Sequence, residues 1–405
     1  MDIYNSLDRR VETFSPISSK EVKLYTCGPT VYSRPHLGNY RTYLWEDTLK
    51  RYLIYNGYKV CHVMNITDFD NTIIRAVKRT GVSREKMTSE NERLFRQDLG
   101  KLGAIPAWKY PHVSTHAKEM AAVVRRLLAK GFAYRDKSGR VFFDISKFPS
   151  YGKLTGKNLS GAKGEVTWEE YKPRQAGDFL IWQPGVHEPH GSCRCCESES
   201  GSAQPPWNIQ CATMSTNALG GQIDIAMGGT DNLFNHHENT RAIAGALFGK
   251  EYSKYWMHIR HLIVDGKKMS KRKGNVVLLP DMERRGFSPK ITRFILLSVH
   301  YRRRLDFTWK YAAEMKGRYL RLAKGIALLK KARGEGSPKF EKLLAQADFR
   351  FRRAMDSDLN VPKAVAAIEK FVFACNNLSL SKKQSLAAIN LLKKSDTALA
   401  FLPLG

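Results

Sequence analysis

Two groups of polar and basic residues, far apart in the chain, could together hold a triphosphate. The sequence His-Leu-Gly-Asn at residues 36–39 lies where a strand-like segment ends and a helical pattern begins. The sequence Lys-Met-Ser-Lys at residues 268–271 brings two ammonium groups onto a loop. A helix N-terminus favours phosphate groups, and lysines on a closing loop stabilise the charge that develops on them. The two motifs together predict an enzyme that activates its substrate with a nucleotide.

The pattern of apolar residues supplies the elements that hold these motifs. Residues 22–27 and 60–66 indicate strands, and residues 40–58 between them carry apolar side chains at helical spacing. Strand, motif, helix and strand form the first crossover of a doubly wound parallel sheet, whose ligands lie at the carboxyl ends of the strands. The predicted fold class is therefore α/β. Further helical patterns cover residues 83–99 and 116–130.

Changes of pattern along the chain divide it into four parts. Short strand-like runs and an irregular segment interrupt the nucleotide-binding pattern, and nearly everything after Pro280 is helical. We expect the first half of a catalytic domain at 1–135, an inserted connective region at 136–206, the second half of the catalytic domain at 207–280 and an α-helical domain at 281–405.

The charge of the chain suggests a polyanionic partner. Its 405 residues include 67 Lys and Arg against 38 Asp and Glu, a formal net charge of +29. Such an excess favours phosphate backbones, although an adaptation of solubility or genome composition would also produce it. No apolar run approaches the roughly 18 residues of a membrane span, and the amino terminus lacks a signal-peptide pattern. Because seven unevenly placed cysteines form no disulfide framework, we expect a cytoplasmic protein without a membrane partner.

Basic residues crowd one helical segment after Pro280. A helical surface along an RNA backbone would explain them, and a solvated helix face is the alternative. The residues are Arg302, Arg303, Arg304, Lys310, Lys316, Arg318, Arg321, Lys324, Lys330, Lys331 and Arg333.

Three residues with distinctive flanks could bind a metal ion. Cys27 lies in Tyr-Thr-Cys-Gly-Pro-Thr, Cys211 in Trp-Asn-Ile-Gln-Cys-Ala and His236 in Phe-Asn-His-His-Glu-Asn. Together with the motifs at 36–39 and 268–271, these segments resemble the class I aminoacyl-tRNA synthetases and, within that class, the cysteinyl enzymes. The resemblance continues in order to near the end of the chain. It implies a Rossmann-like catalytic domain of the HUP type with an inserted small domain, followed by an α-helical bundle that binds tRNA.

The resemblance also implies one Zn²⁺ per chain, held by Cys27, Cys211 and His236, that selects the substrate by its thiol. Zinc prefers thiolate, and three protein ligands leave the fourth position for the substrate sulfur. Taken singly, a buried free cysteine or a hydrogen-bonded core histidine would explain each residue better, and it is the matching flanks that favour the metal.

Two positions depart from the family's pattern. The family commonly supplies a glutamate as fourth ligand, four residues after the histidine, and this chain has Thr240 there. Whether Thr240 or the nearby Glu238 contributes to the zinc site stays open. Ala226 stands where a histidine is usual below the pocket, whereas Trp207 is kept. We therefore expect a three-ligand site with a lower affinity for metal.

By the same resemblance, ATP enters with Mg²⁺ and reacts with L-cysteine. His36 and Asn39 are expected to contact the phosphates, and Lys268 and Lys271 to stabilise the leaving pyrophosphate; these four are the expected catalytic residues. The expected ATP-binding residues are His36, Gly38, Asn39, Asp231, Lys268, Met269, Ser270 and Lys271, and those for the substrate cysteine are Thr67 and Trp207.

A second group of possible metal ligands lies inside the irregular segment. Its composition suits a structural metal site, but the spacing matches no standard finger, and a reactive loop is the alternative. The residues are His187, His190, Cys193, Cys195 and Cys196.

Three interpretations of the acceptor follow. The first is transfer of cysteine to tRNA(Cys) by a monomeric synthetase that is shortened, because the family's small C-terminal domain has no counterpart here. The second is a tRNA-independent ligase that joins cysteine to a small amine and resembles the cysteine ligase of mycothiol synthesis, which also ends early and lacks the zinc-bound glutamate. The third is a catalytically silent paralogue, against which the intact nucleotide motifs argue.

Overall fold

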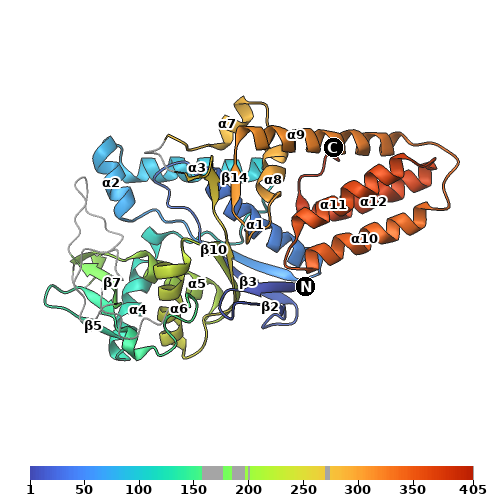
Figure 1. Cartoon of the computed structure of the whole chain (residues 1–405). Helices are drawn as coiled ribbons and strands as arrows, with labels where there is room; N and C mark the ends of the chain where they lie inside the picture. Colours follow the sequence, from blue (N-terminus) through green and yellow to red (C-terminus); the bar gives the residue numbers. More distant parts are fainter. Residues whose placement is uncertain (157–176, 185–196, 199–200, 270–273, 405) are drawn as a thin grey trace.

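Figure 1 shows a computed structural model of the chain. It describes residues 1–156, 177–184, 197–198, 201–269 and 274–404. Within these residues, no helix is both long enough and apolar enough to cross a membrane.

A four-stranded parallel sheet forms the centre of the catalytic part. Its strands lie in the order β11-β10-β3-β4, with bounds Ser253–Ile259, Ile223–Gly229, Glu21–Thr26 and Lys59–Met64. The helix α1 (Leu37–Tyr55) connects β3 to β4, and α6 (Glu238–Phe248) lies between β10 and β11. Because the chain leaves β3 and β10 in opposite directions, these neighbouring strands form the switch point at which open α/β sheets bind ligands.

The helix α1 is buried on most of its surface, including at several polar positions. Leu44, Leu49, Tyr52 and Leu53 are fully buried, and even Arg41 is enclosed. The Arg41 guanidinium donates to backbone carbonyls that include those of Leu296 and Arg303, so the buried charge is satisfied by the segments that follow the sheet. Leu44 and Leu296 belong to the same hydrophobic core.

Between β4 and β10 the chain forms helices and a second sheet. The helices are α2 (Asn71–Thr80), α3 (Arg84–Lys101), α4 (Ala117–Ala129) and α5 (Trp207–Leu219), with 3-10 turns at Val113–Thr115 and Ile145–Lys147. The second sheet is antiparallel in the order β5-β6-β7-β9-β8, with bounds Ala133–Arg135, Val141–Phe143, Phe179–Pro184, Gly201–Gln204 and Glu197–Ser198.

Smaller elements connect the catalytic part to the rest. The hairpin of β1 (Asp2–Asn5) and β2 (Arg10–Thr13) lies beside β11, and a three-stranded sheet has the order β13-β12-β14. Its strands span Lys267–Lys268, Leu262–Val264 and Leu305–Phe307, and the helices α7 (Leu279–Arg284) and α8 (Pro289–Leu297) lie between them in sequence.

Four helices complete the chain and extend to one side in Figure 1. They are α9 (Trp309–Lys331), α10 (Phe340–Asp356), α11 (Val361–Asn376) and α12 (Lys382–Leu399). One continuous hydrophobic core runs from Leu24 in the central sheet to Leu392 in α12, so the bundle packs directly on the catalytic part. The predicted fold class is confirmed, with β14 as a short strand inside the predicted helical region, whereas the bounds of the four predicted parts stay predictions.

Candidate active site

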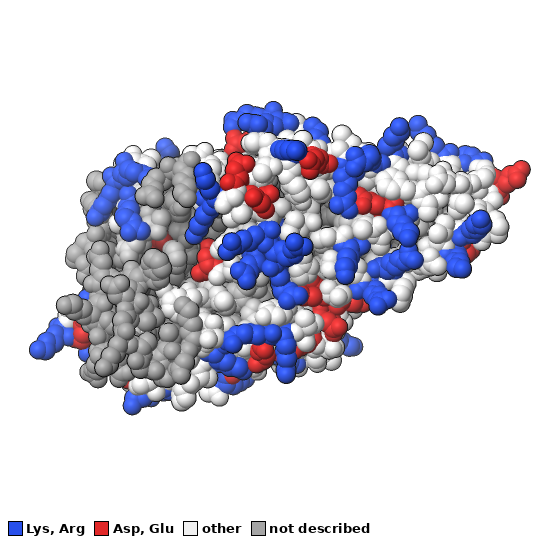
Figure 2. Space-filling view, in the orientation of Figure 1, with Lys and Arg blue, Asp and Glu red and all other residues white. Residues whose placement is uncertain are grey.

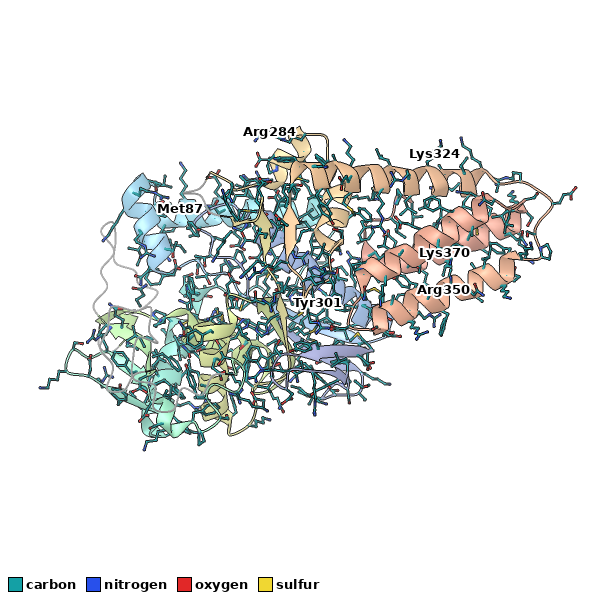
Figure 3. The ribbon with its side chains drawn as sticks, in the orientation of Figure 1. Met87, Arg284, Tyr301, Lys324, Arg350 and Lys370 are labelled. Carbon is teal, nitrogen blue, oxygen red and sulfur yellow. The ribbon has the colours of Figure 1, made fainter. Side chains whose placement is uncertain are left out.

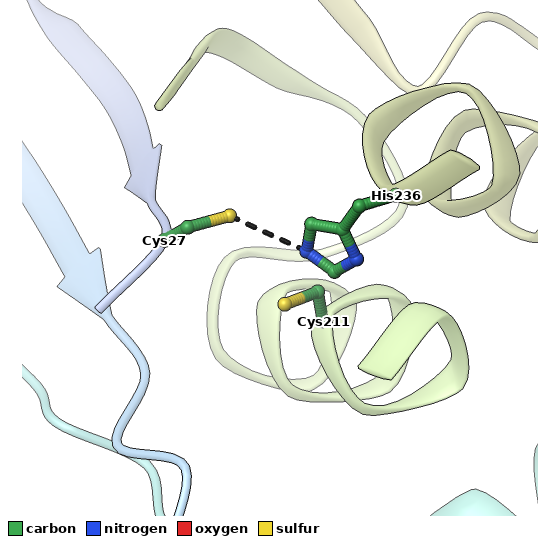
Figure 4. A group of neighbouring side chains, drawn as sticks. All are labelled: Cys27, Cys211 and His236. Carbon is green, nitrogen blue, oxygen red and sulfur yellow. Dashed lines mark hydrogen bonds between the residues drawn. The ribbon is translucent and has the colours of Figure 1, made fainter. Parts of the chain in front are cut away.

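The three predicted metal ligands lie together at the switch point of the sheet. Cys27 follows β3, Cys211 lies on α5, and His236 lies in the irregular helical turn Leu233–His237 after β10. Their ligand atoms all lie within 4.8 Å of one another, and Cys27 Sγ is 3.5 Å from His236 Nε2. Figure 4 shows the three side chains converging from separate elements.

Asn65 connects the residues around this triad. Its side-chain oxygen accepts hydrogen bonds from the backbone N–H of Gly28 at 3.0 Å and from the Tyr25 hydroxyl at 3.0 Å, and it lies 3.9 Å from Cys211 Sγ. Its amide nitrogen donates to the Thr67 hydroxyl at 3.1 Å. A Cβ atom at Gly28 would lie 1.7 Å from the Asn65 carbonyl oxygen, so only glycine fits directly after Cys27.

The donor set fits a zinc ion. His236 Nδ1 lies 3.2 Å from the Asn208 side-chain oxygen, an acceptor that keeps the proton on Nδ1 and directs the Nε2 lone pair toward the thiols. Two sulfurs and one imidazole nitrogen are ligands that zinc prefers, and a three-ligand set leaves a position for substrate. Cys27, Cys211 and His236 would therefore hold the metal.

The environment of the two thiols separates their acidities. A hydrogen bond between them lowers the pKa of Cys211, and a hydrogen bond with His236 acts in the same direction. The same hydrogen bond, together with burial, raises the pKa of Cys27. The pair therefore gives up its first proton at Cys211, and a bound cation would favour thiolate at both positions.

A chain of buried histidines continues from Cys27 into the protein. His237 Nε2 lies 3.1 Å from Cys27 Sγ, His237 Nδ1 lies 2.9 Å from His258 Nε2, and His258 Nδ1 lies 2.8 Å from the Ser6 hydroxyl. Burial lowers the pKa of His237 well below its usual value and that of His258 to about 3. Both rings are therefore neutral at physiological pH, and each offers one donor and one acceptor to the chain.

The two positions that the sequence left open have different surroundings. The Glu238 carboxylate contacts Arg241 at 3.0 Å and accepts from the Thr155 N–H at 3.0 Å, so it is held away from the triad by its own ion pair. The Thr240 hydroxyl is buried and has no hydrogen-bond partner in the part of the chain that the structure describes. Ala226 is buried in the sheet, in the same apolar cluster as Cys211.

The predicted phosphate-binding residues form the N-terminal cap of α1. His36 Nδ1 accepts from the Asn39 backbone N–H at 3.3 Å, and the Asn39 side-chain oxygen accepts from the His36 N–H at 3.1 Å. A Cβ atom at Gly38 would lie 3.0 Å from the His36 ring. The motif thus fixes the first turn of a long buried helix, whose N-terminus favours anions.

The second motif is described only in part. Lys268 ends the exposed strand β13, its carbonyl accepts from the Asn275 side chain at 3.3 Å, and Met269 is buried in the core. Ser270 and Lys271 lie outside the described residues. So do His187, His190, Cys193, Cys195 and Cys196, so the possible second metal site stays a prediction.

A cavity of about 550 Å³ lies beside the triad. His236, Trp207 and Asp231 line it, and the Trp207 indole donates to the Asp70 carboxylate at 3.0 Å while its ring meets His236 edge to face. Thr67 is buried and is tied to the loop after β3 by backbone bonds with Pro29 and Val31. The structure thus brings Trp207, Asp231 and His236 to one cavity and places Thr67 in the loop network behind it.

Sequence reasoning assigned no role to four residues of this arrangement: Asn65, Asn208, His237 and His258. Asn208 and His237 lie inside the segments quoted around Cys211 and His236, and Asn65 lies two residues before Thr67, which was an available signal. His258 gains its role from long-range contacts that no local pattern contains.

Comparison with known proteins places this geometry in a family. The family described as tRNA synthetases class I (C) catalytic domain matches residues 13–316. The chain is 38% identical to a cysteine–tRNA ligase of Chlamydia pneumoniae over 410 residues, covering 99% of this chain and 86% of that protein. A cysteine–tRNA ligase of Methanosarcina mazei is also 38% identical, over 93% of this chain and 81% of that protein.

Solved structures agree on the fold. The methionyl-tRNA synthetase of Mycobacterium tuberculosis bound by methionyl-adenylate superposes with a TM-score of 0.71 at 14% identity, covering 94% of this chain and 92% of that one. A LeuRS–tRNA–LeuAMS ternary complex of Agrobacterium radiobacter K84 gives 0.69 at 13% identity, covering 96% and 85%. At such identities the likeness concerns architecture alone. The matching catalytic domain and the near full-length identity to two ligases of one specificity show that the chain belongs to the class I cysteinyl-tRNA synthetase family.

Proposed function

We propose that the protein activates L-cysteine with ATP and transfers the cysteinyl group to tRNA(Cys). The observation that carries the proposal is the convergence of Cys27, Cys211 and His236 within 4.8 Å of one another, at the switch point from which the capped helix α1 departs. A thiol-selective group and an anion-binding helix end thus lie at the same edge of one sheet.

In the first step, a cysteine carboxylate oxygen bonds to the α-phosphorus of ATP while the bond to the pyrophosphate oxygen breaks. The N-terminus of α1, capped by His36 and Asn39, offers positive potential to the phosphates. Lys268 and Lys271 would stabilise the charge that develops on the pyrophosphate, and Mg²⁺ would accompany it. Gly38 allows the nucleotide to lie close to the backbone.

Selection of cysteine would rest on the triad. A bound zinc ion supplies a preference for thiolate over hydroxyl, which pocket shape alone would not provide. Asn208 holds the ring of His236, and Asn65 holds the loop of Cys27 through Gly28, so these two amides keep the ligand atoms converged. Trp207 would cover the bound cysteine on the side that faces the cavity.

The basic segment of the bundle supports an RNA partner. Arg302 and Arg318 are neutralised by Asp358 and Glu369, at 2.8 and 2.7 Å. Four cations of α9 are exposed, form no ion pair with the described residues and, at 3.6 residues per turn, share one face. They are Lys310, Arg321, Lys324 and Lys331, of which Figure 3 shows Lys324 extending away from the other helices of the bundle. We infer that this face lies along the tRNA backbone.

The test is a pair of assays on the purified chain, accompanied by a metal analysis. Cysteine-dependent exchange of pyrophosphate into ATP reports the first step, and charging of tRNA(Cys) reports the second. Both should occur, with one zinc per chain. Exchange that proceeds equally well with serine would contradict selection by the triad.

The small-amine ligase remains the second candidate because Thr240 occupies the position at which the synthetase family supplies glutamate. The same assays separate the two functions. Cysteine exchange without tRNA charging, accompanied by cysteine conjugation to an amino sugar, would support the ligase.

A further inference from the structure

One side of the cavity beside the triad is formed by residues that the activation of cysteine does not use. Its volume of about 550 Å³ falls within the roughly 300–1,000 Å³ of pockets that hold whole small ligands. Apart from Trp207 and Asn208, which the proposed activation of cysteine already uses, amide and aromatic side chains dominate the lining: Asn71, Gln204, Asn232, Asn235, Asn239, Tyr151, Phe179 and Phe234. Aromatic faces stack on nucleobases and amides bond to base edges, so this lining suits a nucleoside.

Part of the lining is available to a ligand. Asn208 is held by His236, and Asn239 accepts from the Tyr151 hydroxyl. Four other amides of the lining form no side-chain hydrogen bond within the described part of the chain: Asn71, Gln204, Asn232 and Asn235. Trp207 is 47% exposed, which is unusual for so large an apolar ring.

The helix α2 connects this cavity to the outer surface. Asn71 and Arg75 line the cavity, and Arg75, Lys78 and Arg79 are all exposed on the same face at spacings of three and four residues. The opposite face buries Ile73, Ala76 and Val77 against Met87 of α3, which Figure 3 labels where α2 and α3 meet. Packing of the apolar face against α3 therefore holds the basic face of α2 toward solvent.

The three cations of α2 are exposed to solvent. None forms an ion pair with a carboxylate among the residues that the structure describes, and Figure 2 shows Lys and Arg side chains gathered over the position of α2. Arg75 to Arg79 spans about 6 Å of helix axis at 1.5 Å per residue, or about two nucleotides of a stacked strand at ~3.4 Å each. A short row of exposed cations that ends at a nucleoside-sized cavity fits a single RNA strand.

We propose that Arg75, Lys78 and Arg79 bind the phosphates next to the 3′ end of the acceptor RNA and guide its terminal nucleoside into the cavity beside His236. The inference rests on the proposed function, because it gives the tRNA a route to the activated cysteine. A small amine acceptor would need the cavity and would make no use of the cations outside it.

The first test replaces the row of cations. In Arg75→Ala/Lys78→Ala/Arg79→Ala, kcat/KM for tRNA charging is expected to fall at least tenfold, while pyrophosphate exchange stays within twofold of the unmodified chain. The slope of log kcat/KM against log salt should become shallower by about 2, since each lost single-strand phosphate contact removes about 0.7. An unchanged slope would indicate a merely structural defect and would count against the proposal.

A matched control removes three exposed cations elsewhere. Lys118 and Arg125 of α4 and Lys137 of the β5–β6 turn are exposed and do not line the cavity. Lys118→Ala/Arg125→Ala/Lys137→Ala makes the same change of net charge and is expected to charge tRNA as the unmodified chain does. Equal kinetics for the two triple variants would overturn the inference.

A second test locates the contact on the RNA. Binding of intact tRNA(Cys) and of the same tRNA without its last three nucleotides is measured in the absence of ATP. Truncation should weaken binding to the unmodified chain and have little effect on binding to the α2 variant, because the variant has already lost that contact. If truncation weakens binding equally in both proteins, the α2 cations do not contact the 3′ end of the RNA, and the assignment is refuted. A chain that activates cysteine and charges no tRNA would instead overturn the proposed function, and the inference with it.

Discussion

Cys211 supplies one of the three ligand atoms of the proposed zinc site, and its hydrogen bond with Cys27 lowers its pKa. We expect Cys211→Ser to lose bound zinc and to reduce kcat/KM for cysteine in pyrophosphate exchange by more than about 100-fold. Loss of a residue that only supports a metal ligand costs up to about 100-fold, and loss of a ligand itself should cost more. Metal analysis and exchange assays with cysteine and serine measure both effects. Cys61→Ser is the control, since Cys61 lies on β4 outside the triad. A Cys211→Ser protein that still prefers cysteine over serine would exclude the zinc mechanism.

Asn208 would act on a bound metal through its contact with His236. Removing its carbonyl oxygen in Asn208→Ala frees the His236 ring to rotate and to change tautomer, so zinc affinity is expected to fall about 10- to 100-fold. Titration with a zinc-binding competitor dye measures the affinity directly, without any assay of activity. Asn208→Asp keeps an acceptor at the same place and should retain most of the affinity. If both variants bind zinc as the unmodified chain does, the ring is held by other contacts.

At the scale of elements, the cap of α1 combines a structural role with a proposed functional one. Asn39→Ala removes the oxygen that accepts from the His36 N–H and is expected to lower the free energy of unfolding by about 1 kcal/mol, as loss of a cap usually does. It should also slow pyrophosphate exchange, because the first turn would no longer present His36 to the phosphates. Urea unfolding and exchange kinetics measure the two effects.

Ser288→Ala separates these effects, since Ser288 caps α8 by accepting from the Ile291 N–H at 3.3 Å. It should cost similar stability and leave exchange unchanged. An exchange rate that falls equally in both variants would show that the loss reflects stability alone.

The elements that local pattern determines could be predicted from the sequence. The helix predicted at 40–58 is α1, and the strand predicted at 60–66 is β4, with ends displaced by a few residues. No helix is predicted at residues 71–80, where α2 is short and buries one narrow face on α3. The motif residues were found because their local sequences are distinctive.

The remainder depends on pairings between distant segments. β3 lies beside β10, with Leu24 opposite Ile225, and no local pattern specifies that register. The same pairing brings Cys27 near His236 and His237. The roles of Asn208 and His258 follow only once α5 and β11 have packed against these strands, so tertiary contact rather than sequence periodicity creates them.

At the scale of the whole molecule, buried histidines make the fold sensitive to acid. Burial lowers the pKa of His62 and of His258 to about 3, and it lowers that of His237 in the same direction. In the unfolded chain these rings have pKa values near 6.5. Below about pH 6.5 they are therefore protonated in the unfolded state while they stay neutral in the folded state. The free energy of unfolding is therefore expected to fall as pH decreases from about 6.5 toward 3, measured by urea unfolding at pH 7.5 and 5.

His112 provides the opposite case on the same protein. Its hydrogen bond to Glu92 at 2.8 Å raises its pKa, so its contribution is fully present below about pH 6.5 and is lost as pH rises through the raised value. His62→Gln removes a group that only the unfolded state protonates, and it should narrow the difference in stability between pH 7.5 and 5. His112→Gln removes a contribution that favours the lower pH and should widen that difference. Parallel pH dependences in the two variants would show that burial of neutral histidines does not govern acid unfolding, and would direct attention to the carboxylates instead.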